Sequence, residues 1–164
     1  MKKISYFIIS LIFLMNTIAC TGYKPIFSSS NLKIKIVDYS ITGDKRLGNQ
    51  IYSKLHRFTQ LDADGPEVKN ISILINSSKN KEAMVKDTTG KILTYKINLL
   101  TIITVKDFTT DKVIINESFS YFSSYKVQDQ YSETLNLENR LTENLINRTY
   151  EDLLIKMTEI NIEK

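Results

Sequence analysis

The chain has 164 residues, of which 42% are hydrophobic and 24% are charged. This composition is that of an ordinary folded chain, and it excludes a disordered, collagen-like or polytopic membrane protein. The length suits a single domain and is short for two domains. The formal net charge is only +4 and lysine strongly outnumbers arginine, which argues against a nucleic-acid partner. A single cysteine excludes an intramolecular disulfide and a cysteine-rich zinc site.

The N-terminus has the pattern of a bacterial signal peptide. Lys2 and Lys3 precede an uncharged apolar run at residues 4–15, which is shorter than the ~20 residues that a membrane-spanning helix needs. A small residue then stands directly before Cys20. This arrangement resembles a lipobox, in which the thiol receives a diacylglycerol and the new N-terminal amine is usually acylated too, with a fatty acid such as palmitate. We therefore predict that residues 1–19 are a signal peptide and that Cys20 carries a lipid. The alternatives are an ordinary secretory signal and an uncleaved anchor helix.

Residues 20–31 are predicted to be a lipid-anchored tether, because they combine glycine, proline and serine. Thr21 follows the cysteine, whereas an aspartate at that position would indicate retention in the inner membrane. The outer membrane is therefore the expected location, with the domain on its periplasmic side.

Residues 32–164 are predicted to form a single α+β domain, because their apolar residues recur with period two in some segments and with period 3.6 in others. The expected order is β-α-β-β-β-α, which gives a four-stranded, mostly antiparallel sheet with two helices packed on one face. The expected strands are 32–43, 68–77, 93–105 and 113–121, and the expected helices are 44–58 and 134–158.

Local signals mark some of the boundaries. Asp44 is expected to cap the first helix. The segment 79–91 is polar, and residues 87–90 within it are expected to form a tight turn with Gly90 at a positive φ. The last helix has an apolar stripe, and Glu138 falls outside it. Three residues could cap that helix: Ser132, Thr134 and Asn136.

Aromatic residues cluster near the end of the fourth expected strand, at Tyr121, Phe122 and Tyr125. We interpret them as core and sheet surface, and a docking patch is the alternative.

Residues that could carry chemistry are sparse. His56 is the only histidine and has no carboxylate or serine partner at motif spacing, so a surface or boundary position is expected. Asp62, Asp64 and Glu67 lack the ligand spacing of a calcium loop, and a solvated loop is expected there. We therefore expect no enzymatic activity, no metal and no cofactor.

Four lysines flank the tight turn between the second and third strands: Lys79, Lys81, Lys86 and Lys91. They could simply keep a hairpin soluble, or they could contact an anion. Ammonium groups bind phosphates as point charges, and the phosphorylated lipid A of lipopolysaccharide is such a ligand. Lys86 and Lys91, next to the turn, are the stronger candidates for this contact.

These features together resemble the LptE family of lipopolysaccharide-assembly lipoproteins. The most specific match is the run GYKPIF at residues 22–27, which is similar to a Gly-aromatic-basic-Pro-Leu-aromatic run of the family. Residues 46–55, 89–97 and 137–157 resemble the family's first helix, hairpin and last helix. The resemblance extends from residue 20 to about residue 158, which is nearly the whole mature chain.

The resemblance implies a non-enzymatic protein that is attached to the membrane by its N-terminal lipid. Such a protein plugs the lumen of an LptD-type outer-membrane β-barrel, supports the assembly of that barrel, and assists delivery of lipopolysaccharide to the outer leaflet. The polar strand faces suit a polar barrel interior. The alternative is a periplasm-facing adaptor or structural lipoprotein of another envelope transport machine, without lipopolysaccharide binding.

Overall fold

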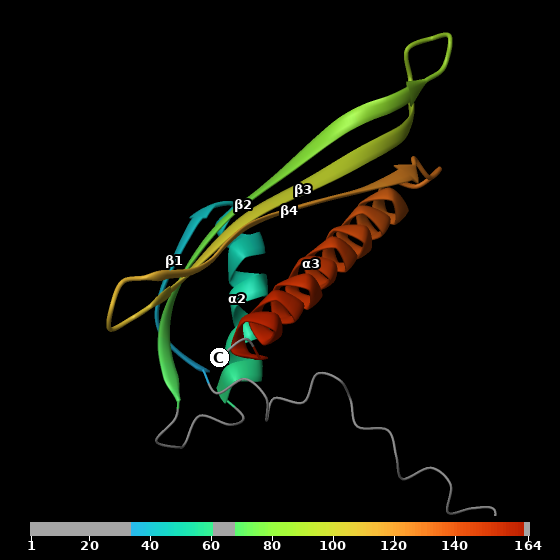
Figure 1. The fold of residues 1–164 in the computed structure, drawn as a ribbon. Helices are drawn as coiled ribbons and strands as arrows, with labels where there is room; N and C mark the ends of the chain where they lie inside the picture. The colour runs from blue at the N-terminus through green and yellow to red at the C-terminus, as the bar shows by residue number, and fades with distance from the viewer. Residues whose placement is uncertain (1–33, 61–67, 163–164) are drawn as a thin grey trace, which may run out of the picture.

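The computed structural model describes residues 34–60 and 68–162, which form one sheet with two helices on the same face of it (Figure 1). The predicted order β-α-β-β-β-α and the α+β class are confirmed. The predicted signal peptide, Cys20, the tether and the acidic loop residues lie outside the described residues. The elements are β1 (Ile34–Gly43), α2 (Lys45–Gln60), β2 (Lys69–Lys86), β3 (Ile92–Asp107), β4 (Val113–Lys126) and α3 (Tyr131–Ile162).

The strands lie in the order β1-β2-β3-β4. β1 pairs with β2 in parallel, and the other two pairings are antiparallel, so the sheet is mostly antiparallel as predicted. α2 connects the two parallel strands and runs back along them. Its last turn therefore lies at the same end of the sheet as the beginnings of β1 and β2, where Ile34 pairs with Lys69. We call this end the base, and α3 also ends there (Figure 1).

The core lies between the sheet and the two helices. Side chains alternate between the two faces of each strand, and the isoleucines of β2 at 71, 73 and 75 are buried on the helix side. Leu47, Ile51 and Leu55 of α2 are fully buried against that face. In β3 the predicted register is confirmed, because Ile97 is fully buried while Asn98 is not.

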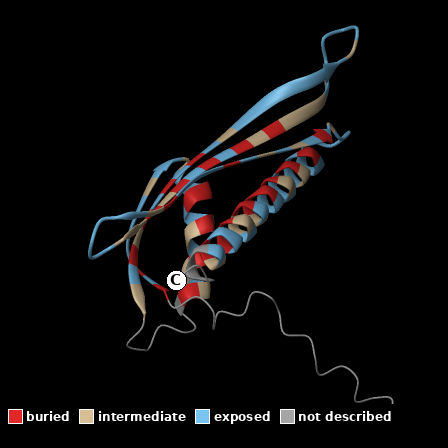
Figure 2. Cartoon of the chain, viewed as in Figure 1, coloured by how far each residue is buried: buried red, intermediate tan, exposed pale blue. Residues whose placement is uncertain are grey.

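β2 and β3 continue well beyond the core (Figure 2). The prediction that the second strand ends near residue 77 is wrong, since β2 reaches Lys86, which pairs with Ile92 of β3. Hydrophobic alternation in β2 stops at Ile75 because its inner face continues with Ser77 and Lys79, but backbone pairing with β3 keeps the chain extended. β4 likewise extends to Lys126, beyond its expected end.

α3 begins earlier than expected, at Tyr131. Its first intrahelical hydrogen bond runs from the Thr134 amide to the Gln130 carbonyl (3.2 Å). The Thr134 hydroxyl, one of the expected caps, accepts a hydrogen bond from the backbone amide of Gln128 (2.8 Å) and donates one to the Gln130 carbonyl (3.4 Å). It therefore joins the incoming chain to the start of the helix and does not cap a free helix amide. No helix within residues 34–60 or 68–162 is long and apolar enough to cross a membrane.

Candidate functional site

The turn at residues 87–91 forms the far end of the β2–β3 hairpin (Figure 1). One oxygen of the Asp87 carboxylate accepts hydrogen bonds from the amide of Thr89 (2.8 Å) and the amide of Lys91 (3.0 Å), and from the Thr89 hydroxyl (2.7 Å). These bonds hold the pKa of Asp87 below its usual value, with the Thr89 hydroxyl as the largest contribution. Gly90 has φ +85°, a left-handed conformation that favours glycine. The predicted turn is confirmed.

Lys86 and Lys91 stand on either side of this turn, and both are exposed. Among the residues that the structure describes, no carboxylate lies within ion-pair distance of either ammonium group. Three apolar side chains beside them are also exposed: Met84, Val85 and Leu93. The hairpin end therefore combines two unpaired cations with apolar surface, which is the surface that an amphipathic anion needs.

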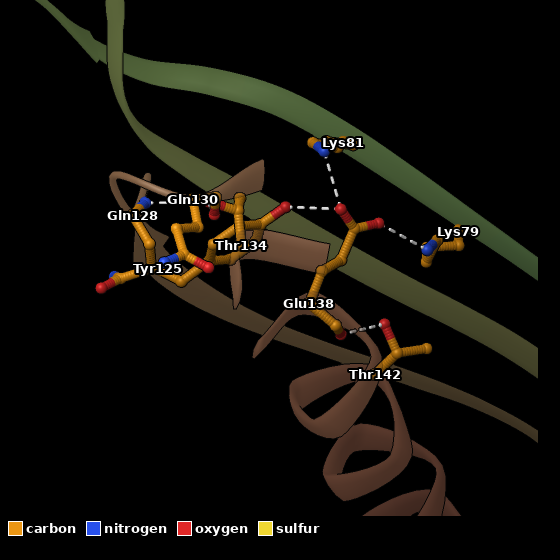
Figure 3. A network of polar contacts seen from close by, with 8 residues as sticks. All are labelled: Lys79, Lys81, Tyr125, Gln128, Gln130, Thr134, Glu138 and Thr142. Atoms are coloured by element: carbon orange, nitrogen blue, oxygen red, sulfur yellow. Dashed lines mark hydrogen bonds and ion pairs between the residues drawn. The ribbon is translucent and has the colours of Figure 1, made fainter. Parts of the chain in front are cut away.

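Lys79 and Lys81 have a different environment from the two lysines at the turn. Both lie on β2 and form ion pairs with Glu138 of α3, at 2.9 and 2.7 Å (Figure 3). The Tyr125 hydroxyl of β4 donates a third hydrogen bond to the same carboxylate (2.7 Å). We call Lys79, Lys81, Tyr125 and Glu138 the Glu138 cluster. It binds the far half of the hairpin to the beginning of α3.

Burial of Glu138 contradicts the expectation that it lies outside the packed face of the last helix. The residue is only 8% exposed. Its face of α3 continues through Thr142 and Thr149 to Leu153, all of them buried, at the spacing that places residues on one side of a helix. The first half of the buried face of α3 is thus polar, and a search for apolar residues alone misses it.

The inner face of β2 changes from apolar to polar opposite the polar half of α3. On the inner face of β2, the buried isoleucines are followed by Ser77, Lys79 and Lys81 at the same period of two. Ser77 is fully buried, and its hydroxyl lies 3.4 Å from that of Thr101 in β3. Continuing the strand period past Ile75 would have placed the two lysines opposite the polar half of α3.

The pKa values reflect this pairing. Burial alone would raise the pKa of Glu138, but hydrogen bonds from Lys79, Lys81 and Tyr125 lower it to about 2. Burial opposes the charge of Lys81, yet its bonds to Glu138 and Tyr125 raise its pKa above the usual value. Burial and the bond to Glu138 raise the pKa of Tyr125 to about 12. The carboxylate is therefore charged at neutral pH and attracts both lysines.

The four lysines singled out from the sequence thus form two groups. Lys86 and Lys91 face solvent, whereas an external anion at Lys79 or Lys81 would have to compete with a buried carboxylate. The ammonium group of Lys81 also lies 4.2 Å from the centre of the Tyr95 ring, which adds a cation–π contact.

The aromatic cluster divides between the two faces of the sheet. Tyr125 is buried, Tyr121 is half-buried, and Phe122 is 69% exposed on the other face. The Tyr121 hydroxyl donates a hydrogen bond to Asp152 of α3. Burial and this bond raise the pKa of Tyr121 to about 12. The interpretation as core plus sheet surface agrees with these positions.

His56 lies at the boundary of the fold, as predicted. It is half-buried and stacks on Tyr52, with ring centres 5.3 Å apart. Tyr52 in turn stacks on Tyr39 of β1 at 4.0 Å. Within residues 34–60 and 68–162, histidine, cysteine, aspartate and glutamate side chains form no group of three or more that could hold a metal ion.

The fold is that of a group of small bacterial lipoproteins of known structure. Rare lipoprotein B from Shewanella oneidensis matches with a TM-score of 0.52 and 17% sequence identity, over 77% of this chain and 99% of its own. A lipoprotein from Caulobacter crescentus matches at 0.55 and 12% identity, over 83% and 96% of the two chains. Lipoprotein B from Nitrosomonas europaea matches at 0.55 and 12% identity, over 82% and 88%.

At these identities the similarity establishes the fold, and nothing finer. No protein-family model matches the chain, and no curated protein matches it significantly in sequence.

Proposed function

We propose that this protein is a non-enzymatic lipoprotein of the LptE type. It is acylated at Cys20, lies at the outer membrane, plugs and supports an LptD-type barrel, and assists delivery of lipopolysaccharide to the outer leaflet. The observation that carries the proposal is the match to nearly the whole of rare lipoprotein B in a chain that begins with a lipobox-like segment. The run at residues 22–27 supports it at the level of sequence.

The open face of the sheet fits a polar barrel interior. Its central part carries uncharged side chains, among them Asn76 and Ser78 of β2 and Ser118 and Ser120 of β4, all of them exposed. The lumen of an outer-membrane barrel is polar, while its outer surface is apolar. The face is mixed, because exposed Leu100 and Ile102 of β3 lie between these residues. Its asparagine and serine side chains can exchange hydrogen bonds with such a lumen without burying an unpaired charge.

The hairpin end fits an amphipathic phosphorylated lipid. The ammonium groups of Lys86 and Lys91 can pair with phosphates, while Met84, Val85 and Leu93 offer apolar contact to acyl chains. The contact becomes stronger where the surroundings are partly desolvated, because the local dielectric constant is lower there.

The test is a double variant, Lys86→Ala with Lys91→Ala. We expect it to fold and to join the barrel complex, yet to bind lipopolysaccharide about three- to tenfold more weakly, since each exposed ion pair contributes ~0–1 kcal/mol. The loss should shrink as salt screens the contact. A matched control removes two exposed lysines elsewhere, with Lys35→Ala and Lys112→Ala.

If the folded variant binds lipopolysaccharide as well as the wild type at low salt, the two turn lysines do not contact the lipid and serve only to keep the hairpin soluble. If the protein then also failed to co-purify with a barrel, the adaptor lipoprotein of another envelope machine would be the better description.

A further inference from the structure

The two helices form a shallow cleft, wide open to solvent, at a distance from the hairpin end. It lies between the last two turns of α2 and the middle of α3 and has a volume of about 350 Å³. This volume is at the lower end of the range for small-ligand sites. Its lining residues are Lys54, Arg57, Phe58, Asn147, Tyr150 and Glu151.

Two cations dominate the α2 side of the cleft. Lys54 and Arg57 are three positions apart and so lie on one side of the helix. In the part of the chain that the structure describes, neither side chain forms an ion pair with a carboxylate. Arg57 donates from Nε to its own helix, at the Ser53 carbonyl (3.3 Å), and this bond does not use its two terminal nitrogens. Such a pair of donors suits a phosphate group.

The remaining side chains define what the phosphate would be attached to. Phe58 and Tyr150 are half-buried and supply apolar surface beside the cations. Burial raises the pKa of Tyr150 and nearby Arg57 opposes that rise, so the phenol stays neutral and can donate a hydrogen bond. Glu151 repels a dianion, but it can accept hydrogen bonds from hydroxyl groups. The lining thus favours a monoanionic phosphodiester with hydroxyl and apolar parts over free inorganic phosphate.

The position of the cleft points to the source of that phosphodiester. Arg57 and Phe58 are near the end of α2, which is at the base, where the described chain begins at Ile34 (Figure 1). Residues 21–33 separate Ile34 from Cys20, and at ~3.5 Å per residue they reach at most about 50 Å. β2 has 18 residues, so at ~3.3 Å per residue the turn at its far end lies about 60 Å from the start of the strand at the base. The base is therefore the end of the domain that a lipid at Cys20 holds nearest to the membrane.

We propose that this cleft binds the phosphate of a phospholipid headgroup. The contact gives the protein a second attachment to the membrane surface and orients the domain with its hairpin away from that surface. The orientation rests on the proposed acylation of Cys20, whereas the binding site itself rests only on the described side chains.

The experiment uses the full chain as it is exported, labelled with ¹⁵N and held in a neutral detergent. Short-chain phosphatidylglycerol is titrated in, and the backbone amide signals of residues 54–58 and 147–151 are followed by NMR. We expect these signals to shift saturably. Lys54→Gln with Arg57→Gln should raise the Kd about tenfold, which corresponds to ~1.4 kcal/mol of binding free energy, since it removes both cations of the cleft. The matched control, Lys45→Gln with Arg46→Gln, removes two exposed cations from the first turn of the same helix and should stay within twofold.

Three results would overturn the proposal. Equal shifts with a short-chain diacylglycerol, which has the acyl chains but no phosphate, would mean that the phosphate is not what binds. Equal affinity for inorganic phosphate would reduce the cleft to a simple anion site. An unchanged Kd in the Lys54 and Arg57 variant would place the lipid elsewhere. The last turn of a helix also favours cations, so melting temperatures are compared to separate lost binding from lost stability. Lys86→Ala with Lys91→Ala should leave this titration unchanged, so the two proposals fail independently.

Discussion

The carboxylate of Glu138 joins three elements, because it accepts bonds from two lysines of β2 and from Tyr125 of β4 while belonging to α3. A buried charge is tolerated only where such partners satisfy it. Thr142 donates its hydroxyl to the Glu138 carbonyl one turn later (2.8 Å), so the polar contacts continue along the buried face of the helix.

Replacing Glu138 by Gln keeps the shape of the side chain but removes its charge, and leaves Lys79 and Lys81 partly buried without a counter-ion. We expect the free energy of unfolding at pH 7 to fall by about 2–3 kcal/mol. Urea titration monitored by circular dichroism measures it. Glu143→Gln, an exposed position of the same helix, serves as the control and should change stability by less than ~0.5 kcal/mol.

The same substitution has a defined pH dependence. The pKa of Glu138 is about 2 in the folded protein, against an ordinary value of 4.5 for a glutamate. Its contribution to stability is therefore fully present above about pH 4.5 and is lost as pH falls toward 2. The stability difference between wild type and Glu138→Gln should shrink over this interval. A difference that stays constant from pH 5 to pH 2.5 would mean that the carboxylate is not held in its charged form.

At the scale of elements, the junction between β1 and α2 is held by both backbone conformation and hydrogen bonds. Gly43 ends β1 with φ +72°, and the next amide, that of Asp44, donates to the Ser77 carbonyl of β2 (2.6 Å). The Asp44 side chain then accepts from the amides of Arg46 (3.0 Å) and Leu47 (3.2 Å), which confirms it as the helix cap. Within the two residues Gly43 and Asp44, β1 ends, the chain reverses direction and α2 is capped.

Gly43→Ala should be more damaging than Gly90→Ala, although both glycines have positive φ. A Cβ at Gly43 would overlap the Ser77 carbonyl, whereas a Cβ at Gly90 would meet no heavy atom within 4 Å. We expect a loss of about 1 kcal/mol at Gly90 from backbone strain alone, and clearly more than 2 kcal/mol at Gly43. Thermal unfolding of the two variants measures the difference. Equal melting temperatures would show that the junction relaxes without cost.

At the scale of the whole molecule, the core and the proposed lipid contact are concentrated toward the base, while the hairpin reaches away from it (Figure 2). The far half of β2 is exposed on both faces from residue 80 to residue 86. Its attachment to the rest of the domain depends on strand pairing with β3 and on the Glu138 cluster. This arrangement presents Lys86 and Lys91 far from the end where the anchor would be.

The anchor itself is tested by metabolic labelling of cells with an acyl-chain analogue. We expect the protein to be labelled and to fractionate with membranes, and Cys20→Ala to abolish the label because no other thiol exists in the chain. Equal labelling of that variant would remove the lipoprotein assignment. Release of the wild-type protein into the soluble fraction would favour the alternative of an ordinary secretory signal.

Most of the fold could be predicted from the sequence because it depends on local patterns. The period of two in β2 and β3 and the period of 3.6 in α2 determine which residues face the core, whatever lies opposite them. The cap at Asp44 and the turn at residues 87–90 are likewise encoded within four or five neighbouring residues. The length of β2 could not be predicted in this way. Backbone pairing with β3 keeps β2 extended as far as Lys86, where its side chains no longer alternate between apolar and polar.

The tertiary structure alone decided which charged residues belong together. Glu138 lies 59 residues from Lys79 and 57 from Lys81, so no local pattern relates them, and their polarity marked all three as surface residues. Contact between the sheet and α3 makes two of the four lysines, Lys79 and Lys81, ion-pair partners of a buried carboxylate. The other two, Lys86 and Lys91, are exposed at the turn and have no such partner among the described residues. The cleft of Lys54 and Arg57 arises in the same way, because its walls come from two helices that are far apart in the chain and are brought together only by packing on one sheet.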